Sequence, residues 1–406
     1  MKNLKLFSFL IIASSLLFVQ CTSDPIPGPA GADGVDGVDG VSTGPGTSTT
    51  ELLAKKVFLG PQIDGIIDAS WENAQVLQVV SEVPEPGDNV FQGYVGQKHD
   101  VEVRAQYDNE YIYFLAQWKD GQLNLNRDTW YYEDDGDPAT IDWHQESNKP
   151  VFDGSGNKTR EAFYEDKFAM QWDINNTTTD WNSQTCFATC HTGLGAATGY
   201  AKHYTIAAGE HTDMWHWKSV RNGIFYNQFD DKNVTDTPQD DARHGDAHVG
   251  GGYHNNKQTL SGVTVPKYYI PGKEYYYWIT DLDINSSNAK LITAVDVATG
   301  ILTDEDGNTI NPSTEIRYQR DGETTGAFGM PSVYLEPFNG SRGDIEAASS
   351  FEGNGWTLEW KRKLDTGNDD DVIFDPVQEY PFGLGVFDNA AIAHAITAFL
   401  NLKFEQ

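Results

Sequence analysis

The 406-residue sequence has few cysteines, few methionines and a shortage of basic residues. It contains three cysteines, four methionines, and 28 lysines and arginines against 60 aspartates and glutamates, which gives a formal net charge of −32 at pH 7. A surface this acidic repels nucleic acid and anionic lipid, and it suits a cationic redox partner or divalent cations. We therefore expect no nucleic-acid partner. With so few cysteines, each one can be considered individually.

Common catalytic motifs are also absent from the sequence. It has no phosphate-binding loop, no Ser-His-Asp arrangement at a recognisable spacing, and no paired-carboxylate motif that stands out from the general acidity. We therefore expect this chain not to be an enzyme by itself. Beyond one apolar run at the start, no segment is long and apolar enough to cross a bilayer. We expect a soluble body that is at most tethered to a membrane.

Residues 1–20 are typical of an export signal, with two lysines followed by an apolar run at 6–19. Cys21 ends this segment, and residues 17–21 resemble a lipoprotein box in which the cysteine is lipidated. Gln20 stands where a small residue is usual, so a plain signal peptide with an unrelated cysteine is the alternative. We predict lipidation at Cys21 and a lipid anchor in the outer membrane, on its periplasmic or cell-surface face.

Residues 21–50 are predicted to be a linker, because glycine recurs at every third position from Gly28 to Gly40 in a collagen-like pattern. Five triplets are too few for a stable triple helix, so an extended spacer is expected. The remaining residues, 51–406, contain no second linker and no internal repeat. They are predicted to form one elaborated domain.

Alternating apolar and polar residues predict a mostly β structure. A hairpin is expected from strands at 101–107 and 111–118, and further strands at 168–172 and 356–362, with a weaker one at 275–278. Acidic loops rich in glycine and asparagine are expected at 119–160, 226–262 and 296–328. This pattern favours an all-β fold, a β-sandwich of the immunoglobulin-like or carbohydrate-binding-module-like jelly-roll type, with long loops and a few short helices.

The segment Cys186-Phe187-Ala188-Thr189-Cys190-His191 carries the clearest chemistry. Covalent haem attachment requires two thiols that bond the porphyrin vinyl groups and an adjacent histidine that ligates the iron. The spacing here is C-x3-C-H, one residue longer than the usual C-x-x-C-H. Two alternatives remain open at this point. Cysteines four apart can form a small disulfide, and the same residues can hold another metal ion.

Several ordered motifs resemble a known family. The stretch 63–74 (IDGIIDASWENA) looks like the opening of family 9 carbohydrate-binding modules and of the haem-binding domain named after the gamma subunit of ethylbenzene dehydrogenase. Later motifs follow the order of the haem-binding domain: 165–172, 186–191, 213–218, 243–246, 343–345, 355–364 and 386–388. The resemblance covers roughly residues 57–404, and it implies a β-sandwich that holds one haem between its sheets and transfers electrons.

In that family, gamma subunits carry a b-type haem with Met and Lys ligands, whereas other members carry a Cys-x-x-x-Cys-His segment and resemble c-type cytochromes. This chain resembles the second group. The resemblance implies that Cys186 and Cys190 attach the haem and that His191 is the proximal iron ligand. It places the second ligand after the Phe-Asp pair at 387–388, where His394 is the ligand-type residue. A histidine that hydrogen-bonds to the backbone is the alternative for His394.

Other candidates for the distal ligand are Met214, His216 and His203, whereas Met170 is expected to pack in the core. Met214 and His216 alternate with two tryptophans on one predicted strand. If Trp215 and Trp217 fill the core, Met214 and His216 point away from it.

Two acidic regions suggest further metal sites. One contains His244 and His248 with Asp240, Asp241 and Asp246, although a place near the haem edge or in a loop is favoured for 243–246. The other, 304–308, resembles part of a calcium loop but lacks the bidentate glutamate, so a solvated turn is favoured.

We interpret the chain as an exported, lipid-anchored electron-transfer protein with one c-type haem and a redox partner that docks through a basic patch. The alternatives are a family-9-like surface carbohydrate-binding module, whose tryptophans would stack on sugars, and a b-type haem subunit of a molybdenum dehydrogenase or respiratory complex.

Overall fold

The structure is a computed structural model, and it describes residues 46–85, 89–133, 143–191, 202–236, 243–247, 250–273, 276–312, 318–320, 323–327 and 329–406. These residues belong to one compact unit, Gly44–Gln406. The predicted export signal, Cys21 and most of the predicted linker lie outside the described residues. A short strand, β1 (Thr47–Ser48), already lies within the end of the segment predicted to be linker.

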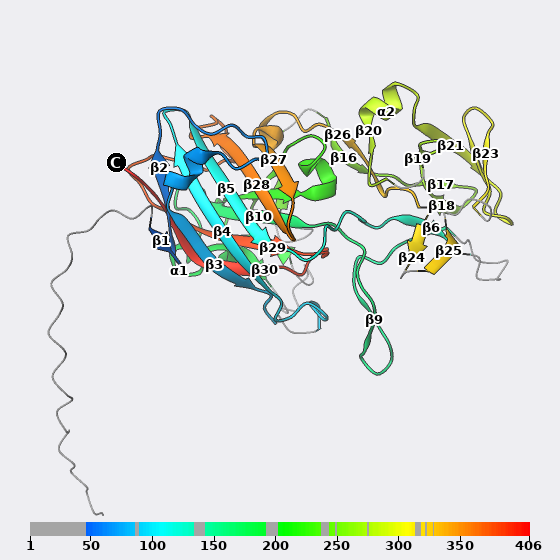
Figure 1. Cartoon of the computed structure of the whole chain (residues 1–406), viewed down its shortest axis with the longest axis horizontal. Helices are drawn as coiled ribbons and strands as arrows, with labels where there is room; N and C mark the ends of the chain where they lie inside the picture. The colour runs from blue at the N-terminus through cyan, green and yellow to red at the C-terminus, as the bar shows by residue number, and fades with distance from the viewer. Residues whose placement is uncertain are drawn as a thin grey trace, which may run out of the picture. The chain divides into compact units, whose positions relative to one another are not determined.

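The strands of the main sheet form two layers (Figure 1). The first layer consists of β15 (Arg243–Gly245), β14 (Asp230–Val234), β13 (Thr212–Lys218), β10 (Lys167–Asp173), β29 (Tyr380–Phe387) and β30 (Ala395–Phe404). The second consists of β3 (Val76–Glu82), β4 (Lys98–Tyr107), β5 (Tyr111–Lys119), β28 (Gly355–Lys363) and β27 (Glu346–Phe351). Two strands connect the layers. The strand β2 (Glu51–Lys56) pairs in parallel with β30 at its start and with β4 at its end, and Glu82 at the end of β3 pairs with Ile396 of β30.

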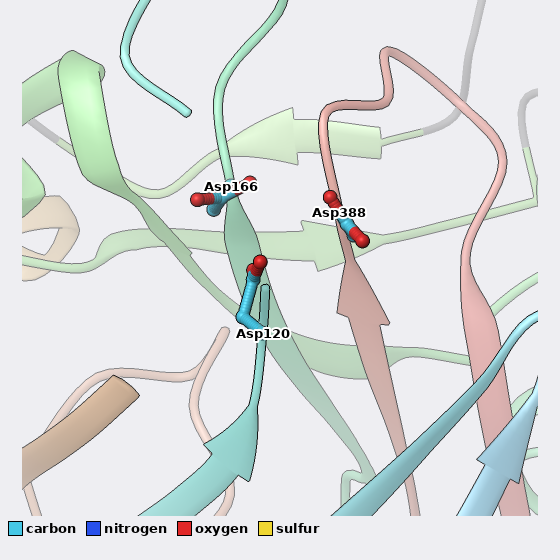
Figure 2. A group of neighbouring side chains, drawn as sticks. All are labelled: Asp120, Asp166 and Asp388. Carbon is cyan, nitrogen blue, oxygen red and sulfur yellow. The ribbon is translucent and has the colours of Figure 1, made fainter. Parts of the chain in front are cut away.

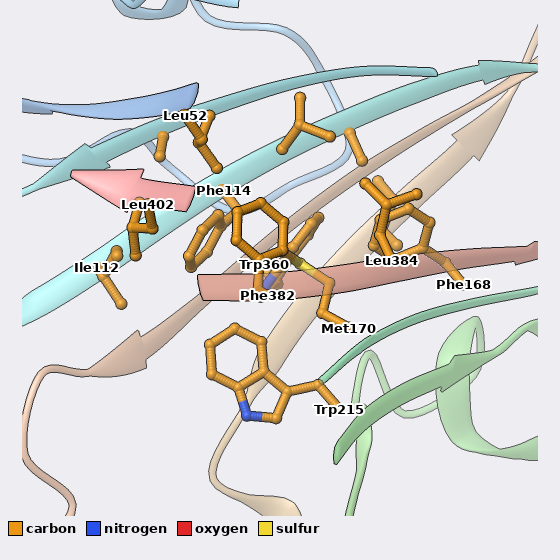
Figure 3. Packing of buried hydrophobic residues seen from close by; sticks show 14 of the residues in the cluster. Leu52, Ile112, Phe114, Phe168, Met170, Trp215, Trp360, Phe382, Leu384 and Leu402 are labelled. Carbon is orange, nitrogen blue, oxygen red and sulfur yellow. The ribbon is translucent and has the colours of Figure 1, made fainter. Parts of the chain in front are cut away.

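Aromatic side chains from both layers form the core between them, as Figure 3 shows. Phe114 of β5 stacks on Trp360 of the neighbouring β28, with ring centroids 5.1 Å apart. The same ring contacts Trp172 of β10 at 6.2 Å and Trp215 of β13 at 5.7 Å, across the space between the layers. Each aromatic pair adds roughly 0.5–1.5 kcal/mol to the stabilisation from buried area. The structure therefore confirms the predicted β-sandwich.

The strand predictions succeed where the period-two pattern is regular. The hairpin of β4 and β5 pairs over Val101–Tyr107 and Ile112–Trp118, and β10 and β28 include the other strands that the pattern indicated. The weak prediction at 275–278 is wrong for the described residues 276–278, because the strand there, β20, starts at Ile279. Tyr276 is buried although it does not belong to a strand, and this burial accounts for an aromatic residue at that position.

The three segments predicted to be loops contain short strands. The first contains β6 (Trp130–Tyr132), β7 (Trp143–Gln145), β8 (Val151–Phe152) and β9 (Lys158–Arg160). The second contains β14, β15, β16 (Gly252–Asn255) and β17 (Gln258–Leu260), and the third contains β22 (Leu302–Asp304), β23 (Thr309–Ile310), β24 (Tyr318–Arg320) and β25 (Glu323–Ala327). Other strands between β17 and β27 are β18 (Val263–Val265), β19 (Tyr268–Tyr269), β20 (Ile279–Thr280), β21 (Lys290–Val295) and β26 (Val333–Glu336).

A second hydrophobic cluster explains why these acidic segments are ordered. It includes Trp130, Val265, Ile292, Leu302 and Met330, which come from five separate places in the sequence. Because each of these strands contributes only one or two apolar residues, none shows a clear pattern by itself. The prediction of long unstructured loops was therefore wrong in these regions.

Helical segments are short, as expected. They are η1 (Ala69–Asn73), α1 (Trp181–Gln184), η2 (Thr185–Thr189), η3 (Ser219–Gly223), α2 (Asp281–Asn285) and η4 (Ser341–Gly343). Within the described part of the chain, no helix has the length and apolar character needed to cross a membrane. Two small strands, β11 (Cys190–His191) and β12 (Lys202–His203), follow η2 and pair with each other.

Candidate functional site

An open pocket with a cavity volume of about 50 Å³ lies on the outer face of β10, β13, β29 and β30, the face opposite to the core. Side chains alternate across a strand, so Trp215 and Trp217 of β13 enter the core while Met214 and His216 line the pocket. The expectation that Met214 and His216 point away from the core is therefore confirmed. The resemblance implied a haem between the sheets, but there the space is filled by aromatic side chains, and the pocket lies outside the sandwich.

Two glycines of β29 shape one wall of the pocket. A Cβ atom on Gly383 would collide with Sγ of Cys186, and one on Gly385 would lie 3.2 Å from Cδ2 of His394. The intervening residue, Leu384, belongs to the core. Glycine at alternate positions thus lets Cys186 and His394 come close to the backbone of the sheet.

The cysteine segment lies against this sheet through specific hydrogen bonds. The indole Nε1 of Trp181 donates to the carbonyl oxygen of Pro381 (2.9 Å). The side-chain amide of Gln171 on β10 donates to the hydroxyls of Thr189 (3.0 Å) and Thr212 (2.7 Å). These bonds fix α1 and η2 over β10, β13 and β29, which brings the cysteines to the pocket.

Cys186 and Cys190 both line the pocket, and both are free thiols in the structure. The structure thus does not form the disulfide that their spacing permitted. Burial raises the pKa of Cys186 to about 11 and raises that of Cys190 as well, so both thiols are protonated at neutral pH. The Sγ atom of Cys190 lies 3.8 Å from Nδ1 of His203, which also lines the pocket.

His216 is the most unusual side chain of the pocket. It is 6% exposed, and neither of its ring nitrogens has a hydrogen-bond partner. Burial, followed by the charges of Lys218, Lys167 and other nearby cations, lowers its pKa well below the ordinary value, so the imidazole is neutral. A buried nitrogen without a partner costs roughly 1–3 kcal/mol, so a ligand that binds this nitrogen would recover the cost.

His394 lies just before β30 and also faces the pocket. Its Nδ1 lies 2.8 Å from the carbonyl oxygen of Ile392, a contact in which a neutral ring donates from Nδ1 and keeps the Nε2 lone pair. Burial lowers its pKa to about 4. The ring of Phe387 stacks on His394 at 4.6 Å and on His216 at 5.4 Å, so one phenyl ring orients both imidazoles.

The surroundings of the histidines are positively charged although the whole chain is strongly acidic. Arg243 lines the pocket, in agreement with the expected position of 243–246 near the site. The buried Nζ of Lys167 lies 4.0 Å from the ring centroid of Phe387 and donates to the carbonyl oxygen of Ala391 (2.8 Å). Lys167 and Arg243 both contribute to the lowered pKa of each histidine. Burial lowers the pKa of Lys167 itself well below its ordinary value, so Arg243 is the side chain that favours an anionic group on the ligand.

The remaining predicted site residues behave differently. His191 belongs to β11, but its side chain lies outside the described residues, as do Asp240, Asp241 and His248. Met170 is 1% exposed and packs in the core as expected. His244 is exposed and contacts Thr235, whereas Asp246 is buried next to Asn233. Among the described residues, His244 and Asp246 do not belong to a group of three or more metal-ligating side chains.

The acidic turn at 304–308 forms its own hydrogen bonds. The carboxylate of Asp304 accepts hydrogen bonds from the backbone of Asp306 (3.0 Å) and Asn308 (2.8 Å) and from the hydroxyl of Tyr269 (2.8 Å). Its oxygens are therefore already engaged. The favoured interpretation of a simple turn agrees with this geometry.

Sequence reasoning missed the roles of Gly383, Gly385 and Gln171 at the pocket. The sequence did contain a signal for Gly383 and Gly385. Large apolar residues alternate with glycine in the segment 382–386 (FGLGV). In a strand this alternation leaves one face bare. No comparable signal identifies Gln171, because its partners are distant in the sequence.

Comparison with known proteins gave one family match. Residues 68–397 match the family model described as ethylbenzene dehydrogenase. No curated protein matches the sequence. Among solved structures, a family 9 carbohydrate-binding module from Caldicellulosiruptor kristjanssonii in complex with cellotriose is similar at 8% identity, covering 87% of this chain and 93% of that chain, with a TM-score of 0.29.

A second similar structure is a putative carbohydrate-binding protein from Bacteroides uniformis. It is 8% identical, covers 88% of this chain and 100% of that chain, and has a TM-score of 0.31. At such low TM-scores neither likeness carries an argument about function.

Proposed function

Because the chain belongs to the ethylbenzene dehydrogenase family, we propose that it binds one haem in the pocket on the outer face of the sheet and transfers single electrons. The observation that carries this proposal is the convergence of two thiols and two neutral imidazoles in one pocket. Cys186, Cys190, His216 and His394 all line it. Nitrogen and sulfur donors of this kind suit haem iron.

The residues of the pocket fit a haem in three respects. His216 has two buried nitrogens without a protein partner. Gly383 and Gly385 leave the strand bare where a flat ligand would approach the sheet. Arg243 provides positive charge for a carboxylate such as a haem propionate. When bound, the haem supplies the one-electron chemistry.

We assign the covalent attachment to Cys186 and Cys190 and the proximal ligand to His191, which follows Cys190 directly in the sequence. Attachment at Cys186 would hold the group against β29, because this sulfur lies where Gly383 lacks a side chain. The protein contributes orientation, exclusion of water and a fixed pair of axial ligands, which together set the reduction potential.

His394 is our choice for the second axial ligand. Its Nδ1 contact with the Ile392 carbonyl fixes the tautomer and orientation, and this leaves Nε2 to bind a metal. His216, Met214 and His203 line the same pocket and are the alternatives. A pKa of about 4 keeps His394 neutral and ready to ligate at physiological pH.

The carbohydrate-binding alternative receives little support from the tryptophans. Of the eleven tryptophans, ten are no more than 4% exposed, and only Trp278 is partly exposed. Buried indoles hold the core together, as Trp172, Trp215 and Trp360 do, and are not available to stack on sugars. The aromatic content therefore belongs to the fold.

We further propose that the protein acts as an electron-transfer subunit or carrier and not as a catalyst. The family match favours association with an oxidoreductase, including a molybdenum enzyme. The strongly acidic composition favours a partner with a basic docking patch. Export and anchoring through Cys21 in the outer membrane remain part of the proposal, based on the sequence of residues 1–21.

The test is to express the full chain in a host that matures c-type cytochromes and to record its absorption spectrum before and after acid–acetone extraction. A reduced α-band that stays with the protein is expected, and Cys186→Ser with Cys190→Ser should make the haem extractable. Haem that extracts from the unmodified protein would indicate a b-type member. Absence of haem would overturn the proposal.

The axial ligand is tested by His394→Ala and His216→Ala, with His244→Ala as the matched control, since His244 is exposed and outside the pocket. We expect His394→Ala to convert the low-spin spectrum to high spin, and His244→Ala to leave it unchanged. If only His216→Ala has this effect, His216 is the ligand.

A further inference from the structure

Three aspartates that the haem proposal does not use meet at one end of the sandwich. Asp120 follows β5, Asp166 precedes β10 and Asp388 follows β29, and each offers one carboxylate oxygen within 4.8 Å of the others. Asp120 is 3% exposed, Asp166 is fully buried, and Asp388 is partly buried. Figure 2 shows the three side chains near one another, next to the ends of three separate strands.

The charges of this cluster have no strong compensation among the described residues. None of the ion pairs there joins a lysine or arginine to Asp120, Asp166 or Asp388, and the charge of His99 only partly offsets the raised pKa of Asp388. Asp166 instead accepts hydrogen bonds from the backbone amides of Asn124 (2.9 Å) and Asn389 (3.0 Å) and from the indole of Trp356 (3.2 Å). Three uncompensated carboxylates in a dry site repel one another strongly.

A second acidic cluster shows that this lack of compensation is not general in the molecule. Asp213, Asp231 and Asp371 also lie within 4.8 Å of one another and are fully buried. There, the buried guanidinium of Arg362 lies 2.8 Å from Asp213 and 3.7 Å from Asp371. A permanent cation from the chain thus occupies the second cluster, whereas the first has none.

One carboxylate oxygen of the first cluster also lacks a hydrogen-bond donor, as does one oxygen of each aspartate in the second cluster. The Oδ1 atom of Asp120 accepts from the backbone amide of Gln122 (3.0 Å), but its Oδ2 atom is buried and has no hydrogen-bond donor. In Figure 2 the carboxylate of Asp120 is directed toward the other two aspartates. An orphaned carboxylate oxygen of this kind requires either a proton or a cation.

We propose that Asp120, Asp166 and Asp388 bind one calcium ion. Calcium accepts oxygen ligands at 2.3–2.6 Å in flexible geometry. One oxygen from each of the three carboxylates lies within 4.8 Å of the others, which is close enough for all three to contact one ion. Magnesium needs shorter bonds of about 2.0–2.1 Å and near-ideal octahedral geometry. Carboxylate oxygens without nitrogen or sulfur ligands also disfavour zinc and copper.

The site would link three parts of the chain that lead to the pocket. Asp388 directly follows Phe387, whose ring contacts both His216 and His394. The amide of the next residue, Asn389, donates to Asp166, and its side chain donates to the carbonyl oxygen of Ala162 (2.7 Å). Calcium at this position stabilises the segment from Asp388 to His394. The binding itself is independent of the haem proposal.

The experiment uses the full-length protein treated with a chelator and titrated with calcium chloride at about 0.15 M salt, which screens surface acidic groups. We expect one calcium ion per chain by calorimetry. At a hundredfold excess over the dissociation constant, we expect a rise of about 3 °C in the melting temperature. Haem content is recorded in the same samples, so failure of calcium binding is distinguishable from failure of haem binding.

Asp120→Asn keeps the size of the side chain and removes one repelling charge, so the variant is expected to fold and to lose the calcium-dependent rise. Asp388→Asn, at the partly exposed position, is the second variant. The matched control is Asp306→Asn, which removes an exposed carboxylate paired with Lys290 in the acidic turn at 304–308. Retention of the full calcium effect in Asp120→Asn and Asp388→Asn, or no effect in the unmodified protein, would overturn the proposal and indicate that the carboxyl groups hold protons.

Discussion

The two faces of the sheet formed by β10, β13 and β29 have opposite characters, although they are built from alternate residues of the same strands. The inner face carries Trp172, Trp215 and Trp217, whose rings contact Phe114 and Trp118 of the second layer. The outer face carries Gly383 and His216, which line the pocket. The two ring nitrogens of His216 lack hydrogen-bond partners. The inner face therefore determines stability, and the outer face is available for binding.

This difference implies that stability and ligand binding can be changed separately. A substitution on the inner face removes packing that the whole sandwich needs, because its residues contact both layers. A substitution on the outer face alters the pocket while the core remains filled. Each prediction below changes one residue on the inner or the outer face. Each also names a result that would show the two faces to be equivalent.

The largest effect is expected for Trp172→Ala on the inner face. Trp172 is fully buried and contacts the rings of Phe114, Phe382 and Phe374. We expect the free energy of unfolding, measured by urea denaturation, to fall by about 3–5 kcal/mol. The shape of the absorption spectrum of the folded fraction should not change. A loss below about 1 kcal/mol would contradict the role of this face.

A smaller effect on stability, with a large effect on binding, is expected for Gly383→Ala. The added methyl group would displace Cys186 from the pocket wall. Such overpacking costs about 1–3 kcal/mol in unfolding free energy, whereas haem content per chain should fall several-fold. The control is Gly154→Ala, where a Cβ atom meets nothing within 4 Å. Equal haem content in the two variants would refute the assignment of this wall.

The smallest effect on stability, and one of opposite sign, is expected for His216→Leu in the haem-free protein. Removing two buried nitrogens without partners should raise the free energy of unfolding by about 1 kcal/mol at pH 7. Replacement of Met214 by Leu is the matched control, because Met214 lines the same pocket and has no unpaired polar atom. A decrease in stability for His216→Leu would contradict the interpretation of this residue.

The pH dependence of the same variant provides a second measurement. Burial lowers the pKa of His216 and lowers that of His394 to about 4, and the cations Lys167 and Arg243 act in the same direction. Unfolded imidazoles take up protons near pH 6.5, so the unfolded state binds more protons and stability falls as the pH decreases from about 6.5 toward 4. His216→Leu should weaken this acid sensitivity, and Met214→Leu should not.

The sequence allowed the main layers to be predicted because their strands are long and regular. The hairpin of β4 and β5 has an apolar residue at every second position facing the core, so the pattern appears within one short stretch. The second hydrophobic cluster has no such pattern. Trp130 and Met330 are two hundred residues apart in the sequence and pair only in the folded chain. Short strands of this kind are identified only by their neighbours.

For the pocket, the sequence identified the residue types but not their side of the sheet. Cys186, Cys190 and His394 were predicted from motif and resemblance, and they do line one pocket. Met214 and His216 were correctly predicted to point away from the core. Which face carries the pocket could not be predicted, because that depends on α1 and η2 packing over the outside of β29 and β10.

The sequence by itself determined the alternation of aromatic residues with polar or small ones, the spacing of the two cysteines and the acidic character of the chain. All three are local or additive properties, and none of them depends on how distant segments meet. The tertiary structure alone decided that Phe387 contacts both His216 and His394, that aromatic side chains pack between the layers, and that Asp120, Asp166 and Asp388 converge. Several of these contacts join residues far apart in the sequence, up to about 270 positions for Asp120 and Asp388, and only the pairing of whole strands brings such residues together.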